Sequence, residues 1–512
     1  MSVEFNPFSS RPATLSEAEA LIAQLQQKLQ FSELRVLALE EQLRLRRIEK
    51  YGAGSEKLSN LQLELLEREP GVSRVEIQAE SERPVLPGEA TQILIRPRQP
   101  QGKHPGRQTL PANLPRVERV IACAPEQRVC GRCGQPTSVI GYEVSEQLDV
   151  EPAKYFVLVT KREKRACQCG RGGVITAPVP ERIIEKGLVS DRVVINTVVS
   201  KYCEHLPLYR QSVSLELSRA TLDGWVMQVG QLLMPVVGAM KNELLQGRYI
   251  QADETPVEVQ MHDHSGSNHQ AYLWQYSRPC GAVIFDFHLG RGREGPKQFL
   301  GSYAGILQPD GYQAYEHVGG PGLVHAACWT HARRGFWDVL KLNPGDPGAL
   351  PIVEKINELF AVDATAREQE LSLEARQALR RKQAPAVLNG IRTAIETARV
   401  SALPGSALGK ACQYTLGLWP KLTRFLDYPE LELSNNLAEN SMRPVALGRK
   451  NWIHIGSPQA GPKVAAILSI VETCRRIKLP LRQYLSAVLP GLANTRLQRL
   501  PDLTPTSWAG QH

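Results

Sequence analysis

From residue 247 onward, apolar and polar residues alternate with a period of two, which is typical of β-strands. Five such runs follow one another: GRYIQADETPVEVQ, QAYLWQYS, GAVIFDFHL, GILQPDGY and LVHAAC. A helical run, GPKQFLGSYA, separates the third strand from the fourth. Three consecutive strands, a helix and then another strand is the order of an RNase H-like fold. We therefore predict an RNase H-like α/β catalytic core over residues 246–460.

The segments beside this core are helical in pattern. A helical insertion is expected inside the core at about 340–425, and a C-terminal helical region over 461–512. Within 181–245, Ser190 and Ser218 precede helical runs that they can cap. Two helices joined by a turn could form a helix-turn-helix-like DNA-binding region. A plain helical packing module explains the same pattern at least as well.

The first 55 residues carry a heptad pattern. Apolar residues recur every seven positions at Leu15, Ile22, Leu29, Val36 and Leu43. This spacing predicts a leucine-zipper coiled coil over 1–55, through which the protein would form a homo-oligomer. The alternative is an amphipathic helix folded back on its own chain.

Charge and proline content define the next segment. The chain carries a net charge of +9 with a pI of about 9.0, a balance that favours a polyanionic partner such as nucleic acid. Residues 56–115 are rich in proline and turn basic toward their end, so we expect a flexible basic linker. Its basic part could lie along DNA phosphates, or it could be a solvated linker only.

Four cysteines are clustered within residues 116–180. Cys130 and Cys133 form a C-x-x-C pair, and Cys167 and Cys169 form a C-x-C pair. Four thiolates can complete the tetrahedron of a structural Zn²⁺ ion, which predicts a zinc-binding module here. A redox-active pair or unliganded cysteines are the alternatives.

Three acidic residues stand in polar, turn-rich motifs of the predicted core. Asp253 is expected to end the strand RYIQ and open a Thr-Pro turn in QADETP. Asp310 is expected to end the strand GILQ and open a glycine turn in PDGY, and Glu439 follows a helix start expected at Ser434. Three carboxylates can hold two Mg²⁺ (or Mn²⁺) ions, which activate water and stabilise the leaving oxygen of a phosphodiester. Rival acids for a place in the set are Glu254, Asp286 and Glu316.

Other residues near these acids could contact DNA. Cys328 and His331 have a spacing that could bind a metal, but two ligands alone make a poor site. We favour a packed cysteine, with the histidine and the following arginines facing phosphate. The predicted DNA contacts are His331, Arg333, Arg334, Arg443, Arg449 and Lys450.

Several long motifs resemble those of the insertion sequence 66 (IS66) family of transposases, which are bacterial enzymes of the DDE class. The motifs are LPLYRQS, ADETPVEV, PDGYQAY, CWTHARRGF and NNLAENSMRPVALGRKNW. The resemblance implies a multidomain α+β protein with an RNase H-like core and with Asp253, Asp310 and Glu439 as catalytic acids. It also implies Mg²⁺-dependent strand cleavage and transfer between transposon-end DNA and target DNA, with accessory proteins encoded by the same element.

No apolar run is long enough to span a membrane and the start of the chain is unlike a secretory signal, so we expect a cytoplasmic, nucleoid-associated protein. Two other functions are kept beside the transposase. One is a non-catalytic zinc-containing DNA-binding protein, or an inactive transposase remnant. The other is a structure-specific nuclease on the same fold.

Overall fold

The structure is a computed structural model, and its described residues divide into two compact units, one over 179–511 and one within 87–178. It describes residues 156–166, 174–185, 187, 189–261, 267–343, 345–403 and 405–511, together with positions 22, 25, 26, 135 and 136. The four predicted zinc ligands, the linker over 56–115 and nearly all of the coiled coil over 1–55 lie outside the described residues, so they remain predictions. Among the described helices, none is both long and apolar enough to cross a membrane.

The described part of the smaller unit contains one antiparallel pair of strands, β1 (Lys164–Ala166) and β2 (Val174–Thr176). Beside the pair, Arg162 donates a hydrogen bond to the carbonyl of Ala177 at 2.8 Å. In the sequence, the run YFVLVTKREKRACQCG, which starts at Tyr155, predicts a longer strand that leads into the second cysteine pair. Residues 156–163 have no regular structure, because only the part of the run opposite β2 has a partner strand.

The larger unit is built on a mixed sheet with the order β5-β4-β3-β6-β7. The first three strands along the chain pair antiparallel, and β6 and β7 continue the sheet in parallel. Helix α7 (Glu294–Leu300) connects β5 to β6, so the five predicted strands and their intervening helix are confirmed. The strands are β3 (Tyr249–Gln260), β4 (Asn268–Ser277), β5 (Val283–His288), β6 (Ile306–Gln308) and β7 (Val324–His325), with β8 (His454–Ile455) pairing farther along β3.

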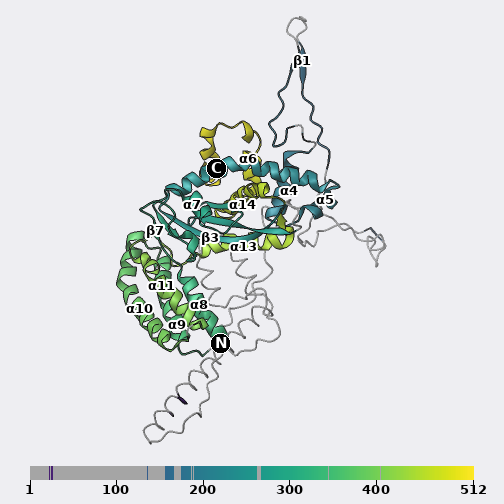
Figure 1. Cartoon of the computed structure of the whole chain (residues 1–512). Helices are drawn as coiled ribbons and strands as arrows, with labels where there is room; N and C mark the ends of the chain where they lie inside the picture. Colours follow the sequence, from purple (N-terminus) through teal and green to yellow (C-terminus); the bar gives the residue numbers. More distant parts are fainter. Residues whose placement is uncertain are drawn as a thin grey trace. The chain divides into compact units, whose positions relative to one another are not determined.

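Two long helices join the sheet in the larger hydrophobic core, α6 (Arg219–Gln246) and α14 (Gly461–Arg476) (Figure 1). They cross closely at Gly230, where a Cβ atom would lie 2.7 Å from the backbone oxygen of Lys463. Helix α14 also covers the edge strand β5, because Thr473 Oγ1 both donates to the carbonyl and accepts from the amide of Val283. Residues 461–476 therefore share one core with the sheet.

Ahead of the sheet, three helices replace the two that the sequence predicted: α4 (Asp191–Tyr202), α5 (Leu208–Leu215) and α6. Ser218 caps α6 by accepting a hydrogen bond from the amide of Thr221, as predicted. Ser190 precedes α4 without such a bond. The extra helix α5 begins after Pro207, whose fixed φ suits a helix start.

The predicted insertion is helical, and Figure 1 shows it as one group of helices next to the β7 end of the sheet. Its apolar residues form a second hydrophobic cluster, which reaches the sheet at Tyr249 and Ile306. The helices are α8 (Trp329–Leu342), α9 (Ala349–Glu368), α10 (Leu373–Ser401), α11 (Ala407–Gly417) and α12 (Trp419–Leu422). The remaining elements are α13 (Asn436–Trp452), α15 (Leu481–Val488), α16 (Pro505–Gln511) and the short 3₁₀ helices 313–315, 424–426, 458–460, 492–494 and 497–503.

Candidate functional site

The register of two parallel strands brings Asp253 and Asp310 together. In the β3–β6 pair, Gln251 lies opposite Gln308. Asp253 and Asp310 each follow their glutamine by two residues. Because neighbouring strands lie about 4.8 Å apart, the two aspartates start from neighbouring backbone positions just beyond the point where the β3–β6 pairing ends.

The surroundings of Asp253 differ from the prediction in one respect. The sequence predicted that a strand ends at Asp253 and a Thr-Pro turn follows, but β3 continues to Gln260. Strand β4 pairs with β3 over its whole length from Gln251, whereas the pairing with β6 stops there. One edge of β3 is thus unpaired beside Pro256, and a proline is tolerated at such a position. Asp253 lies where the β3–β6 pairing ends, within a continuous strand.

Helix α13 carries Glu439 close to Asp253 and Asp310, because hydrogen bonds connect the start of the helix to β3. The side chain of Gln251 donates to the carbonyl of Ser434 at 2.8 Å, and the side chain of Asn435 donates to the carbonyl of Ala252 at 3.5 Å. The helix begins at Asn436, two residues later than predicted, and Glu439 lies in its first turn. An acidic residue is stabilised there by the helix dipole.

Two buried glutamines hold this arrangement together, and sequence reasoning missed both. Gln251 and Gln308 are fully buried. The Gln308 amide donates to the carbonyls of Ala327, at 3.1 Å, and Glu432, at 2.7 Å, so it joins the segment before α13 to the sheet. The signal that could have found them is the shared Gln-x-Asp spacing of Gln251 with Asp253 and of Gln308 with Asp310.

Backbone amides orient both aspartates. Asp253 Oδ1 accepts from the amide of Glu254 at 2.9 Å, and Asp310 Oδ1 accepts from the amide of Tyr312 at 2.8 Å. The second bond needs the tight turn at Gly311, whose φ of 105° suits glycine and few other residues. Tyr414, from the insertion, donates to the carbonyl of Asp310. The predicted glycine turn after Asp310 is therefore confirmed.

The electrostatics of Asp253 reflect a cluster of negative charge. Burial raises the pKa of Asp253 well above its usual range, and the carboxylates of Glu439, Glu254 and Asp310 raise it further. We call Asp253, Asp310 and Glu439 the acid cluster. Carboxylate oxygens are the hard ligands that Mg²⁺ and Mn²⁺ bind, so the chemistry of these three side chains fits a divalent cation.

The rival acids lie beside basic side chains. Each has a basic partner: Glu254 with Arg291 at 2.7 Å, Asp286 with His288 at 2.9 Å, and Glu316 with Lys421. In the part of the chain that the structure describes, no ion pair joins a lysine or arginine to a member of the acid cluster. Glu439 pairs with a histidine, His331, so among the described residues the basic partners of the acid cluster differ from those of Glu254 and Glu316.

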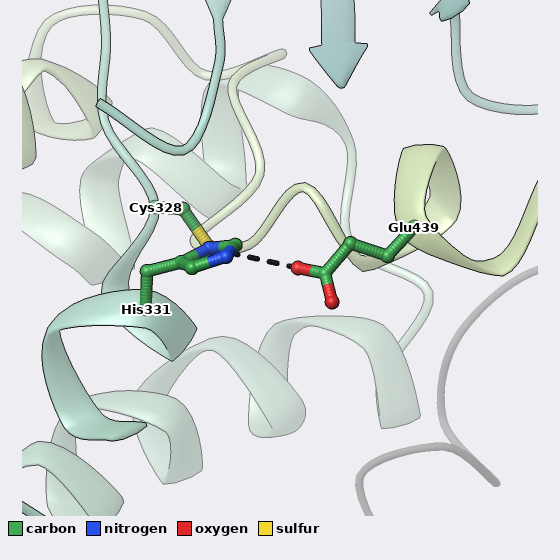
Figure 2. Close-up of side chains that lie close together, drawn as sticks. All are labelled: Cys328, His331 and Glu439. Carbon is green, nitrogen blue, oxygen red and sulfur yellow. Dashed lines mark ion pairs between the residues drawn. The ribbon is translucent and has the colours of Figure 1, made fainter. Parts of the chain in front are cut away.

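A histidine and a cysteine contact the acid cluster from the start of α8. Figure 2 shows the ring of His331 directed at Glu439, with the sulfur of Cys328 beside the ring. His331 Nδ1 lies 3.5 Å from Glu439 Oε1, and the sulfur accepts from the amide of Asn435 at 3.4 Å. Burial would lower the pKa of His331, but Cys328, Glu439 and Asp310 outweigh it and raise the pKa to about 10.

The predicted DNA contacts differ in exposure. Arg333 is only 4% exposed; it donates to Asn357 at 2.7 Å and lies over the ring of Trp337, so it belongs to the packing of the insertion and does not face solvent. The sequence could not show this, because burial depends on α9. Arg449 is half-buried and donates to Thr255. The exposed members are Arg334, Arg443 and Lys450.

The fold and the site together define an α+β protein in which three acidic side chains from distant parts of the chain lie near the end of the β3–β6 pairing. Comparison with protein families narrows this class. Residues 186–463 match the model described as the Transposase IS66 family. Residues 127–170 match the zinc-finger binding domain of transposase IS66, and residues 38–119 match the Transposase C of IS166 homeodomain. The chain belongs to the IS66 transposase family.

Curated relatives come from Sinorhizobium fredii (strain NBRC 101917 / NGR234). The uncharacterized protein y4jD is 32% identical over 90% of this chain and 92% of its own length. The uncharacterized protein y4qI is 29% identical over 95% of this chain and 91% of its own length. No solved structure matches the chain. The family domains support a transposase and DNA-binding role, and the zinc-finger match suggests bound Zn²⁺.

Proposed function

We propose that this protein is a DNA transposase that catalyses divalent-metal-dependent strand cleavage and strand transfer at the ends of an insertion sequence. The observation that carries the proposal is the meeting of Asp253, Asp310 and Glu439 from two strands and a helix. The strand order, with three antiparallel strands followed by parallel ones, supports an RNase H-like core. Membership of the family supports the reaction class.

Side chains and backbone amides of the protein would bind the metal ions and orient the carboxylates that hold them. Asp253, Asp310 and Glu439 would hold Mg²⁺ or Mn²⁺ ions, and when bound these ions activate the attacking water or 3′-hydroxyl and stabilise the departing oxygen. Hydrogen bonds from backbone amides to Asp253 and Asp310 hold their carboxylates in place before DNA binds. Such preorganisation lowers the cost of reaching the transition state.

DNA binding is assigned to basic residues around the acid cluster. His331, Arg334, Arg443, Arg449 and Lys450 would contact the phosphates of transposon-end and target DNA. The zinc module and the helices over 181–245 would extend the interface, and the coiled coil would bring two copies of the chain together. We place the protein in the cytoplasm on the nucleoid, with accessory proteins of the same element as further partners.

A cleavage assay tests this proposal. Full-length protein is incubated with DNA carrying candidate element ends and with Mg²⁺ or Mn²⁺, and both nicking and joining are measured. Asp253→Asn keeps the shape of the side chain but removes its charge, so cleavage should fall by about 10³-fold or more while DNA binding is retained. Asp286→Asn is the matched control, because Asp286 lies on β5 and pairs with His288.

The outcomes separate the candidate functions. Cleavage followed by joining, lost in Asp253→Asn and kept in the control, supports the transposase. Cleavage without joining favours a structure-specific nuclease. DNA binding without either reaction favours a non-catalytic DNA-binding protein or an inactive remnant, and equal cleavage by the wild type and Asp253→Asn would show that this acid has been assigned wrongly.

A further inference from the structure

We propose that Cys328, His331 and Glu439 form a binding site for a transition-metal ion, with Zn²⁺ as its best occupant, and that zinc there withdraws Glu439 from the acid cluster. We call these three residues the Cys–His–Glu cluster. The first part stands on the geometry alone. The second part rests on the proposed function, because it gives zinc an inhibitory role in DNA cleavage.

The three ligand atoms are already gathered. One sulfur, one ring nitrogen and one carboxylate oxygen all lie within 4.8 Å of one another. Ligands of a tetrahedral zinc ion, with bonds of about 2.0–2.3 Å, lie roughly 3.3–3.8 Å apart. The 3.5 Å between His331 Nδ1 and Glu439 Oε1 is within that range, and no two of the three atoms are more than 4.8 Å apart.

Two of the ligand atoms form an ion pair with each other at 3.5 Å, but neither makes a hydrogen bond among the described residues. These atoms, His331 Nδ1 and Glu439 Oε1, are both buried. Buried polar atoms of this kind are costly unless something satisfies them. They face each other across the position that an ion would occupy, with the sulfur of Cys328 beside them (Figure 2).

The ligand types select the metal. A thiolate with an imidazole and one carboxylate suits zinc or a similar transition metal, whereas Mg²⁺ prefers oxygen ligands alone. The side chains of His331 and Glu439 are 24% and 35% exposed, which leaves a path for the ion and for a solvent ligand. Three protein ligands with an open fourth position resemble an exchangeable zinc site more than a closed structural one.

The Cys–His–Glu cluster shares one residue with the acid cluster, so metal binding at one should affect the other. Glu439 belongs to the acid cluster on one side and to the Cys–His–Glu cluster on the other. When its oxygen is bound by zinc beside Cys328 and His331, it is less able to help hold Mg²⁺ near Asp253. Zinc at concentrations far below that of Mg²⁺ should therefore suppress cleavage.

Cobalt binding tests the site without relying on activity. Full-length protein, dialysed against a chelator that removes exchangeable zinc, is titrated with Co²⁺, whose bond to a thiolate gives an intense charge-transfer band. The wild type should bind about one more Co²⁺ than Cys328→Ser and show a band that this variant lacks. Cys412→Ser is the matched control, because Cys412 is also buried but lies on α11 in the insertion. Any zinc-finger cysteines are present in all three proteins, so they cancel in the comparison.

A second variant keeps the test decisive if Cys328→Ser fails to fold. Glu439→Gln keeps the sulfur and the imidazole but weakens the third ligand, so the affinity for Co²⁺ at this site should fall at least about tenfold. Equal stoichiometry and spectra in the wild type and Cys328→Ser would overturn the site. So would an unchanged affinity in Glu439→Gln.

The inhibitory part has its own measurement. Each protein is assayed for Mg²⁺-dependent cleavage with and without added Zn²⁺, and its rate is compared with its own zinc-free rate. Zinc should remove most cleavage by the wild type and by Cys412→Ser, and much less by Cys328→Ser. Equal inhibition of all three would overturn the shared role of Glu439. Absence of cleavage in every condition would refute the proposed function and with it the inhibition, while the cobalt result would still decide the site.

Discussion

Replacing Asp363 by asparagine should destabilise the helical insertion, so that α9 and α10 unfold locally more often. Asp363, on α9, forms ion pairs with Arg380 at 2.6 Å, Arg376 at 2.8 Å and Arg367 at 3.2 Å. Arg376 and Arg367 also pair with Glu432, which lies just before α13. These contacts connect α9 and α10 to the segment that leads to Glu439.

The expected magnitude follows from burial. The side chains of Asp363 and Arg380 are 3% and 1% exposed, so Asp363→Asn leaves a buried guanidinium without its charge partner. Breaking a buried pair from one side costs about 3–5 kcal/mol. Where exchange occurs through local unfolding of α9 and α10, their amide hydrogens should exchange roughly two to four orders of magnitude faster. The surface pair of Arg392 with Glu396 supplies a control, since Glu396→Gln should cost less than about 0.5 kcal/mol.

Hydrogen exchange read by mass spectrometry measures this directly in peptides from α9 and α10. Burial would raise the pKa of Asp363, but Arg380, Arg376 and Arg367 outweigh it and lower the pKa. Its charge therefore stabilises the fold fully above the unfolded pKa of about 3.9, and this stabilisation is lost as the pH falls through the lower folded-state pKa. The wild type and Asp363→Asn should converge in acid. Equal protection of the two proteins at neutral pH would refute the reasoning.

Two further predictions concern segments before the sheet. About one equivalent of zinc should copurify with the protein, and Cys133→Ser should release it and unfold the local module, because metal binding is part of the folding energy of such a module; a metal-free, fully folded wild type would contradict this. A fragment of residues 1–55 should self-associate in analytical ultracentrifugation, and Leu29→Pro should abolish the association by breaking the helix, whereas a monomeric helical wild-type fragment would rule out the coiled coil.

The strands and their order could be predicted because their side chains follow a simple period. The alternation over 249–260 and the aromatic and β-branched residues of β4 and β5 are local properties of the sequence. Pairing is not local. The sequence predicted a strand end at Asp253 because of Pro256, and only the unpaired edge beside β6 explains why β3 continues there.

The acids of the candidate site could be selected from the sequence, but the contacts that bring them together could not. Asp253, Asp310 and Glu439 stand in recognisable motifs, whereas the bonds from Gln251 to Ser434 and from Gln308 to Glu432 span the whole insertion. The insertion also separates Cys328 from Glu439, so the sequence showed two candidate metal ligands where the structure brings a third beside them. Arg333 illustrates the reverse case, since a basic residue in a basic motif is buried against another helix.

The central claim is that Asp253, Asp310 and Glu439 form one site for divalent cations. Anomalous diffraction from crystals of the full-length protein soaked in Mn²⁺ tests it most directly. We expect manganese bound by the carboxylates of Asp253 and Asp310, with Glu439 beside them and two ions about 3.5–4 Å apart when DNA ends are present. Carboxylates more than about 10 Å apart in the DNA complex, or manganese bound elsewhere with none at these three residues, would contradict the account.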